Sequence, residues 1–366
     1  MLEYPTKIVS QSGSVESVGG APAKSGPPAA FQRQPPGILA SFAYGAGLFG
    51  IATPLMWILE KLRRADCFLG SMAARRDQRL GELNPFRHYV PSGHDVFVAT
   101  YAKSGTNWML QIAHQLLYHG IAQFDHIHSV VPWPDTKLIP PFRRYAIPLE
   151  DPSVWMASPE QKRVIKTHFN WELLPYSEDA RYIMVIRDPK DVFVSNYFFL
   201  KATALGPAMP SAGTWFKLYL SENFPLGGSW AVNAAGYWAQ RHRPNVLILS
   251  FKSMKQDLNG AVRVVADFLD VRASDEVIQK VCEQATFDYM KRVDEKFRVW
   301  KMTPWQRPST MLRKGVQGGS SELLSPEQML AADAYFIAEL KRLRSDLPYE
   351  EFCSPALALE SGAATI

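Results

Sequence analysis

A polar loop between a predicted strand and a predicted helix is the first stretch of this sequence that could do chemistry. Residues 96–101 are uncharged and mainly apolar or β-branched, which is typical of a strand covered on both faces. Residues 103–106 read Lys-Ser-Gly-Thr, and apolar side chains then recur at helical spacing over residues 109–117. Backbone N–H groups and the helix dipole favour an anion at such a junction, and the lysine adds a full positive charge. The pattern therefore predicts a phosphate-binding loop.

The order of residues distinguishes this loop from that of the nucleotide triphosphatases. Their loop reads GxxxxGK followed by Ser or Thr, so its lysine comes after the second glycine, next to a hydroxyl for magnesium. Here Lys103 precedes Gly105. An ordinary strand-turn-helix joint without a ligand is the alternative interpretation. On the helix itself, His114 falls on the polar side, so we expect it at the surface.

A second short strand, residues 163–167, ends next to a histidine. Lys166 and His168 are two residues apart, so both point to the same side of an extended chain. The carboxyl end of a parallel strand is where α/β proteins build their sites. The position therefore favours a functional role, although an isolated histidine is more often structural.

A third strand, residues 181–186, leads into a well specified helix start. Asp188 can cap this helix, and Pro189 suits its first position. Ser195 lies two turns after Asp188, within reach of any group that Arg187 holds. The strand also resembles a Walker B segment, which leaves a P-loop kinase or NTPase as an alternative.

Four motifs, in one order over residues 101–315, resemble those of the PAPS-dependent sulfotransferases, where PAPS is 3′-phosphoadenosine 5′-phosphosulfate. Residues 101–108 read YAKSGTNW where that family has YPKSGTTW, and residues 166–168 match its KTH sequence. Arg187 followed eight residues later by Ser195 matches its 3′-phosphate motif, and residues 313–315 match its RKG motif. Together the motifs are much more specific than any one of them alone.

The resemblance implies an α/β, P-loop-containing three-layer fold, in which a central parallel sheet is flanked by helices. Residues 245–251 read as a fourth buried strand, and the alternation of strands and helices along the chain also predicts a parallel sheet. PAPS would be the sulfuryl donor, His168 the catalytic base and Lys103 the group that stabilises the leaving phosphate, and no metal would be needed. Lys166 would hold the sulfuryl oxygens. The residues implied in cofactor binding are Lys103, Ser104, Gly105, Thr106, Asn107, Trp108, Arg187, Ser195, Phe251, Thr286, Phe287, Arg313, Lys314 and Gly315.

Several positions depart from the family pattern. Phe169 and Asn170 replace a Leu-Pro pair, Phe251 replaces a tyrosine near the adenine, and Gly319 with Ser320 replaces an Asp-Trp pair after the RKG motif. The sequence therefore does not decide whether that last segment closes over the cofactor. These departures leave a second alternative, a scaffold that binds PAP or PAPS without turnover. The family's C-terminal dimerisation motif is not recognisable, so the oligomeric state is undetermined.

Composition fits a globular protein that binds an anionic small molecule. The chain has 366 residues, of which 47% are hydrophobic and 20% charged, enough for one large α/β domain. A net charge of +5 without dense Lys/Arg runs suits a nucleotide and not a nucleic acid. Three widely spaced cysteines, and the isolated group Asp125, His126 and His128, indicate neither a disulfide framework nor a metal site.

The composition changes along the chain suggest four segments. Residues 1–36 are rich in Ser, Gly, Pro and Ala and predict a disordered leader, and residues 351–366 a C-terminal tail. Residues 37–84 combine an apolar segment, within a stretch that has no charge from Pro35 to Leu59, with a basic helical linker. The apolar segment either associates with a membrane or packs as a helix on the catalytic domain.

The catalytic domain is expected over residues 85–350, which makes residues 1–84 dispensable for catalysis. We expect a cytoplasmic enzyme, with membrane association through residues 37–59 left open. Its acceptor would be a hydroxyl or an amine, on a small molecule. The acceptor pocket would be built by the irregular segments after Gly120 and after Leu200.

Overall fold

The four predicted strands form one parallel sheet. In the computed structural model, which describes residues 38–138, 147–298, 311–315 and 318–354, the strand order is β2-β1-β3-β4 and every neighbouring pair is parallel. The strands are β1 (Asp95–Ala99), β2 (Arg163–Thr167), β3 (Arg181–Ile186) and β4 (Val246–Ser250). Because β1 has β2 on one side and β3 on the other, the crevice beyond the carboxyl ends of β1 and β3 is the topological switch point, where α/β folds bind ligands. The predicted α/β fold is confirmed.

Helices connect and cover the strands. Those of eight residues or more are α1 (Ile38–Gly47), α2 (Thr53–Lys61), α3 (Ala65–Leu83), α4 (Thr106–Leu117), α6 (Pro189–Leu200), α7 (Ala212–Tyr219), α8 (Trp230–Trp238), α10 (Leu258–Phe268), α11 (Asp275–Ala285) and α13 (Pro326–Arg342). Shorter ones are α5 (Ser153–Met156), α9 (Phe251–Gln256), α12 (Phe287–Arg292) and α14 (Tyr349–Phe352). The predicted cap at Asp188 is present, since its side chain accepts a hydrogen bond from the N–H of Lys190. Ser325 forms a capping box with Gln328 at the start of α13.

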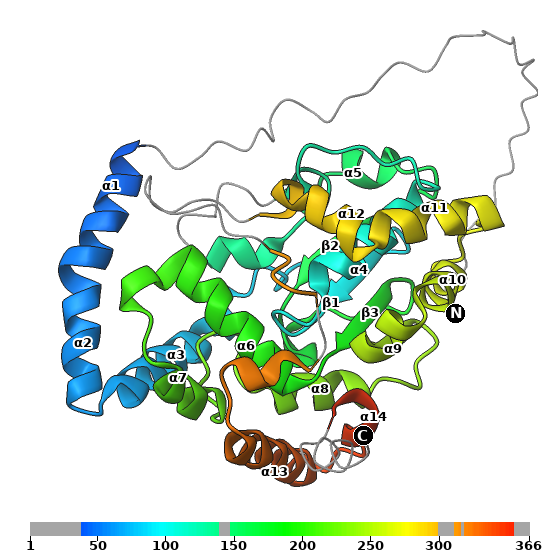
Figure 1. Cartoon of the computed structure of the whole chain (residues 1–366). Helices are drawn as coiled ribbons and strands as arrows, with labels where there is room; N and C mark the ends of the chain where they lie inside the picture. The colour runs from blue at the N-terminus through cyan, green and yellow to red at the C-terminus, as the bar shows by residue number, and fades with distance from the viewer. Residues whose placement is uncertain (1–37, 139–146, 299–310, 316–317, 355–366) are drawn as a thin grey trace, which may run out of the picture.

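The sheet is covered by helices on both faces, as Figure 1 shows. Val96 and Val98 of β1 pack with side chains of α4, α10 and α11, whereas Ala99 and Met184 pack with α6, α7, α8 and α13. The alternation of side chains along a strand explains why neighbouring residues belong to different clusters. The fold therefore has three layers, and the central strands β1 and β3 are buried and mainly apolar because neither face of the sheet meets water there.

The expectation that His114 lies at the surface is wrong. His114 is 4% exposed, and its ring packs against those of Tyr118 and Phe124. The second side of α4 is covered by α11 instead of water, and Gln111 donates a hydrogen bond to the backbone oxygen of Gln284 there. Burial lowers the pKa of His114 to about 4. Polar residues on a helix do not identify a solvent face when a second helix supplies them with partners.

The segment before β1 is helical and contacts the catalytic body. α1, a π-helical turn (Leu48–Ala52) and α2 run end to end as one rod along one edge of the molecule, opposite α10 (Figure 1). α3 packs against α7, with Ala65 and Ala73 buried. Residues 60–84, expected to form a linker, are thus part of the packed structure. The expected leader, residues 1–36, lies outside the described residues.

The C-terminal end of the described chain also packs on the body. Phe352 and Cys353 are buried, and the N–H of Ser354 donates to the Asp188 carboxylate at 2.9 Å. Residues 351–354, assigned to a tail, therefore lie against the start of α6. The rest of that tail falls outside the described residues.

Candidate active site

The predicted phosphate loop lies between the end of β1 and the start of α4. Lys103 and Gly105 both adopt positive φ, +74° and +94°. A Cβ atom at position 105 would lie 2.8 Å from the Phe251 ring, so glycine is required both by its backbone conformation and by this close approach. Lys103 is held in its left-handed conformation by Arg187, whose Nη1 donates to the Lys103 backbone oxygen at 3.1 Å.

The loop and the start of α4 fit the binding of an anionic nucleotide. Within the part of the chain that the structure describes, Ser104 Oγ and Asn107 Oδ1 are buried without a hydrogen-bond partner. Buried polar groups are rarely left unsatisfied, and such exceptions concentrate at ligand sites. The free N–H groups at the start of α4 can donate hydrogen bonds to a phosphate oxygen.

Two lysines in the site lie against aromatic rings. Lys103 Nζ is 3.9 Å from the centre of the Phe199 ring, and Lys166 Nζ is 3.5 Å from the centre of the Trp133 ring. Burial, reinforced by neighbouring positive charges, lowers the pKa of both lysines to about 7. A cluster of buried cations is unfavourable in the absence of an anion, which makes this region a strong anion site.

His168 comes directly after β2, as the sequence predicted, and the backbone fixes its orientation. Its Nδ1 lies 2.8 Å from the backbone oxygen of Thr100, so Nδ1 carries the proton and donates, and Nε2 is left with a free lone pair. Burial, together with Lys166 and Lys103, lowers the pKa of His168 to about 3. The imidazole is therefore neutral at physiological pH and able to accept a proton.

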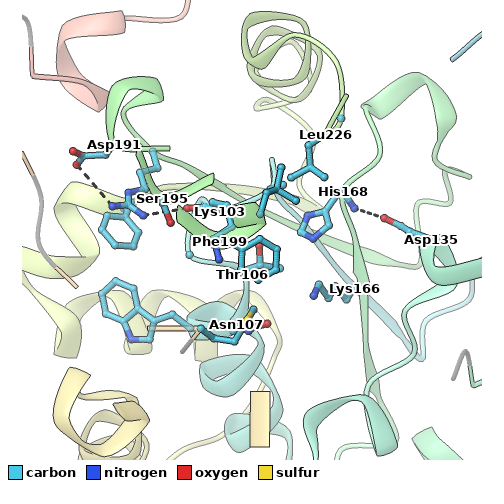
Figure 2. Close-up of a pocket in the computed structure, with 18 of the residues that line it drawn as sticks. Lys103, Thr106, Asn107, Asp135, Lys166, His168, Asp191, Ser195, Phe199 and Leu226 are labelled. Atoms are coloured by element: carbon cyan, nitrogen blue, oxygen red, sulfur yellow. Dashed lines mark hydrogen bonds and ion pairs between the residues drawn. The ribbon is translucent and has the colours of Figure 1, made fainter. Parts of the chain in front are cut away.

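Sequence reasoning missed Asp135, which lies on the other side of His168 from Lys103 (Figure 2). Asp135 Oδ2 accepts a hydrogen bond from the backbone N–H of His168 at 2.7 Å. Burial raises the pKa of Asp135, while this bond and the charge of Lys166 oppose the rise. The residue belongs to the irregular segment after Gly120, where the only available signal was a carboxylate among prolines and tryptophans.

Of the predicted 3′-phosphate residues, Ser195 lies on the opposite side of Lys103 from His168 (Figure 2), and Arg187 contacts the Lys103 backbone. Arg187 follows β3 and lies over the Phe251 ring, with its Cζ 4.5 Å from the ring centre. Asp191, one turn into α6, is 3.9 Å from the Arg187 guanidinium, and burial lowers the pKa of that arginine. Ser195 lies a further turn along the helix and lines the same cavity.

Two aromatic rings mark the position expected for the adenine. Trp108 and Phe251 meet edge to face, with ring centres 5.4 Å apart. Trp108 Nε1 donates to the backbone oxygen of Ala285 at 2.7 Å, which ties the phosphate loop to the segment of Thr286 and Phe287. Phe251 begins α9, directly after β4, and is not the last strand residue as predicted.

The predicted RKG segment, residues 313–315, lies at the rim of the site, and its two cations form ion pairs with Glu322. Arg313 Nη1 and Lys314 Nζ contact the Glu322 carboxylate at 2.6 and 3.0 Å. Gly315 has φ +62°, and a Cβ atom there would collide with the Phe287 ring at 2.2 Å. The segment therefore approaches the adenosine side even though Gly319 and Ser320 replace the family's Asp-Trp pair.

One cavity of about 1320 Å³ joins these groups. Of the predicted site residues, only Ser104 is not part of its lining, because it is buried beneath the loop. The structure adds lining residues that the sequence analysis did not identify, among them Tyr44, Leu80, Trp133, Asp135, Phe199 and Leu226. Two of these come from α1 and α3, the region that the sequence analysis placed outside the catalytic domain. Within the described residues, no group of three or more His, Cys, Asp or Glu side chains could hold a metal.

Comparisons with known proteins agree with this geometry. A model of the sulfotransferase domain matches residues 93–344. Sulfotransferase 2A1 of Macaca fascicularis is 28% identical over 268 residues, which cover 72% of this chain and 89% of that protein. Human sulfotransferase 1C2 is 27% identical over 240 residues, which cover 61% of this chain and 75% of that protein.

Solved structures show the same fold. A retinol dehydratase bound to retinol and PAP superposes with a TM-score of 0.59 at 20% identity, covering 75% of this chain and 88% of that one. Mouse sulfotransferase SULT7A1 bound to PAP gives a TM-score of 0.54 at 22% identity, and the match covers 75% of this chain and 93% of that one. From the matched domain, the curated relatives and the arrangement of the motifs around one cavity, this chain belongs to the sulfotransferase family and is a PAPS-dependent sulfotransferase.

Proposed function

We propose that this enzyme transfers the sulfuryl group of PAPS to the hydroxyl of an apolar small molecule, with His168 as the base. The observation that carries the proposal is the hydrogen bond from His168 Nδ1 to the Thr100 oxygen. This bond fixes the tautomer that leaves Nε2 free to accept the proton of the acceptor hydroxyl. Asp135, which binds the backbone N–H of His168, positions the same residue.

Lys103 and Lys166 complete the proposed catalytic set. Lys103 belongs to the phosphate loop, so its ammonium group is placed to stabilise the charge that develops on the leaving phosphate oxygen. Lys166 lies on the same side of β2 as His168 and is placed to hold the sulfuryl oxygens. PAPS supplies the sulfuryl group, and a sulfuryl group carries less negative charge than a phosphoryl group. Two lysines can therefore balance that charge without a divalent cation.

The 3′-phosphate of the cofactor is proposed to bind beside Arg187 and Ser195. A guanidinium and a hydroxyl are suitable partners for a phosphate, and both side chains reach the cavity. Arg313 and Lys314 are the next cations along the rim and are proposed to join them. Trp108, Phe251 and Phe287 supply the ring surfaces that would contact the adenine.

The proposed acceptor is an apolar alcohol because of the side chains at the other end of the cavity. Beyond His168, the lining includes Phe169, Leu173, Leu200 and Leu226, with Leu80 of α3. An apolar pocket with a few polar groups at one end recognises the body of a ligand by burial and its reactive group by hydrogen bonds. Solved relatives of this fold have been crystallised with retinol and with androsterone, which are compounds of this kind.

An acceptor screen with labelled PAPS tests the proposal. We expect large apolar alcohols to give a higher kcat/KM than amines, sugars or small phenols. Leu226→Ser should raise KM for these alcohols while the Kd for PAP stays unchanged, and Leu330→Ser, on the exposed side of α13, is the matched control. A preference for polar acceptors, or equal effects of the two variants, would contradict the assignment.

The location of the enzyme is also a proposal. We propose a cytoplasmic enzyme that contacts a membrane through residues 37–59. The three cysteines are free thiols, which suits a reducing compartment. The segment Phe42–Lys61 is long and apolar enough to cross a bilayer by length and composition.

A further inference from the structure

The rod formed by α1, the π-helical turn and α2 presents an apolar outer face. Ile51, Trp57 and Leu62 are 70%, 64% and 64% exposed, and Leu55 and Ile58 are exposed beside them. Exposed apolar side chains scattered singly are ordinary, but several that follow one another along the same rod mark an interaction surface. Over Phe42–Lys61 the mean hydropathy reaches 1.5, and only 6% of the residues in that window are buried.

The inner side of the same rod is attached to the catalytic body near both ends. Tyr44 Oη donates to the backbone oxygen of Ala204 at 2.6 Å, and Glu60 accepts from the N–H of Ser211 at 2.9 Å. These two residues are 16 positions apart, or about 24 Å along a helix. A rod that crossed a bilayer would have to carry this part of the body into the hydrocarbon, or break both contacts. The rod is therefore arranged to lie flat on a membrane.

A second feature at the end of the rod points to an anionic partner. A small pocket of about 350 Å³ at the α2–α3 junction is lined by Arg64 and Arg75 together with the apolar side chains of Leu59, Phe68 and Met72. Lys61 and Arg63 are exposed next to it. Two guanidinium groups above apolar side chains match a lipid, whose phosphate meets the arginines and whose acyl chain meets the apolar surface.

We propose that this outer face lies in the plane of an anionic phospholipid bilayer, with Arg64 and Arg75 binding lipid phosphates. In this orientation the acceptor end of the cavity is close to the bilayer, because Tyr44 of α1 and Thr203 and Ala204 beneath it line that cavity. The consequence for catalysis, which rests on the proposed function, is that an apolar acceptor reaches His168 from the membrane.

Vesicle flotation tests the docking without any need for turnover. The full chain should float with vesicles of phosphatidylcholine plus phosphatidylglycerol, and much less with phosphatidylcholine alone. Ile51→Glu with Trp57→Glu should reduce the bound fraction at least tenfold, because it places charges in the apolar layer. The matched control is Ile121→Glu with Val264→Glu, which alters equally apolar, exposed positions elsewhere on the surface and should float like the wild type.

A second variant separates the lipid phosphate site from general charge attraction. Arg64→Gln with Arg75→Gln should weaken binding to the anionic vesicles by roughly fivefold for each arginine. Arg263→Gln with Arg272→Gln, on and beside α10, removes the same charge and should have little effect. In every variant, unchanged PAP binding shows that the catalytic domain is folded.

The outcomes decide between the possible occupants of the outer face. Loss of flotation in the Ile51/Trp57 and Arg64/Arg75 variants alone supports the proposal. A wild type that does not float, or variants that all float equally, overturns it. Self-association that the Ile51/Trp57 variant abolishes, without vesicle binding, would assign the face to a second copy of this chain. Failure of the catalytic proposal would instead appear as absent sulfuryl transfer with normal flotation.

Discussion

Lys103, Lys166 and Arg187 lie against the rings of Phe199, Trp133 and Phe251, so the site holds three cations in place before a nucleotide arrives. Ring faces carry partial negative charge and offset part of the cost of gathering like charges in a buried space. The compensation is incomplete, because burial still lowers the pKa of both lysines to about 7. An incoming phosphate or sulfate relieves this cost and should raise both pKa values again.

The affinity for PAP should therefore fall as the pH rises above about 7. In the free enzyme, Lys103 and Lys166 lose their protons through a pKa of about 7, whereas the bound anion keeps them charged to higher pH. Deprotonation of each lysine in the free enzyme should weaken PAP binding by up to about tenfold per pH unit in that range. Calorimetry in buffers of different ionisation enthalpy should show proton uptake on binding at pH 8. A pH-independent Kd between 6 and 9 would contradict the lowered pKa values.

The same shifts make the ligand-free protein more stable at alkaline pH. Above pH 7 the unfolded chain, whose lysines keep the usual pKa of 10.5, binds more protons than the folded chain. The free energy of unfolding contributed by these groups thus rises from about pH 7 to about pH 10.5. Urea titrations of the wild type and of Lys166→Met across this pH range check whether the free energy of unfolding rises with pH. A wild-type slope that is absent or reversed relative to the variant would exclude the effect.

Ser195→Ala should weaken PAP by about tenfold to a hundredfold and leave AMP nearly unchanged. A hydrogen bond to a charged group contributes roughly 1.5 to 3 kcal/mol, and each 1.4 kcal/mol is a tenfold change in affinity. Arg313→Ala should likewise weaken the binding of PAP more than the binding of AMP. Titrating both nucleotides against each variant is the measurement. Equal losses for PAP and AMP would remove these residues from the 3′-phosphate site.

If Arg313 and Lys314 bind the 3′-phosphate as proposed, Glu322 should compete with it for these two cations. Its pairs with them are partly exposed, and such ion pairs contribute at most about 1 kcal/mol. Glu322→Gln should therefore tighten PAP by no more than about fivefold, with no change for AMP. If the variant weakens both nucleotides, Glu322 instead supports the shape of the rim.

Among the elements, the strands and the phosphate loop could be predicted well from the sequence, because buried parallel strands are uninterrupted apolar runs and the polar breaks after them are short. The wall of the acceptor pocket could not be predicted. Leu80 and Tyr44 lie on helices that are remote in sequence from the motifs, and no local pattern shows that α3 packs against α7. Phe199 and Trp133 were missed for a similar reason, since an aromatic residue on a helix or in a loop is usually part of the core.

A chain that begins at Asn84 tests the role of α1 to α3. The sequence alone suggested that residues 1–84 are dispensable, but removing α3 exposes the part of α7 against which it packs, and opens the cavity wall at Leu80. We expect a lower Tm and a higher acceptor KM, with PAP bound nearly as well as by the full chain. A truncated enzyme with unchanged Tm and acceptor kinetics would show that α3 is not part of the site.

At the scale of the whole molecule, the topological switch point brings the proposed sites of the two substrates together. The phosphate loop follows β1, Lys166 lies on β2 with His168 directly after it, and Arg187 follows β3. The sheet order β2-β1-β3 thus puts the proposed acceptor side and the proposed nucleotide side on either side of Lys103. A single cavity of about 1320 Å³, more than most single-ligand pockets, spans both sides. This arrangement suits direct in-line transfer between two bound molecules.

The central claim, that His168 is the base of sulfuryl transfer, is tested most directly by comparing His168→Ala with His242→Ala, an exposed histidine far from the motifs. The account predicts that His168→Ala lowers the rate of transfer from labelled PAPS by on the order of 10² to 10⁴. PAP should bind with nearly unchanged affinity, and His242→Ala should behave as the wild type. Retention by His168→Ala of more than about a tenth of wild-type activity would contradict it.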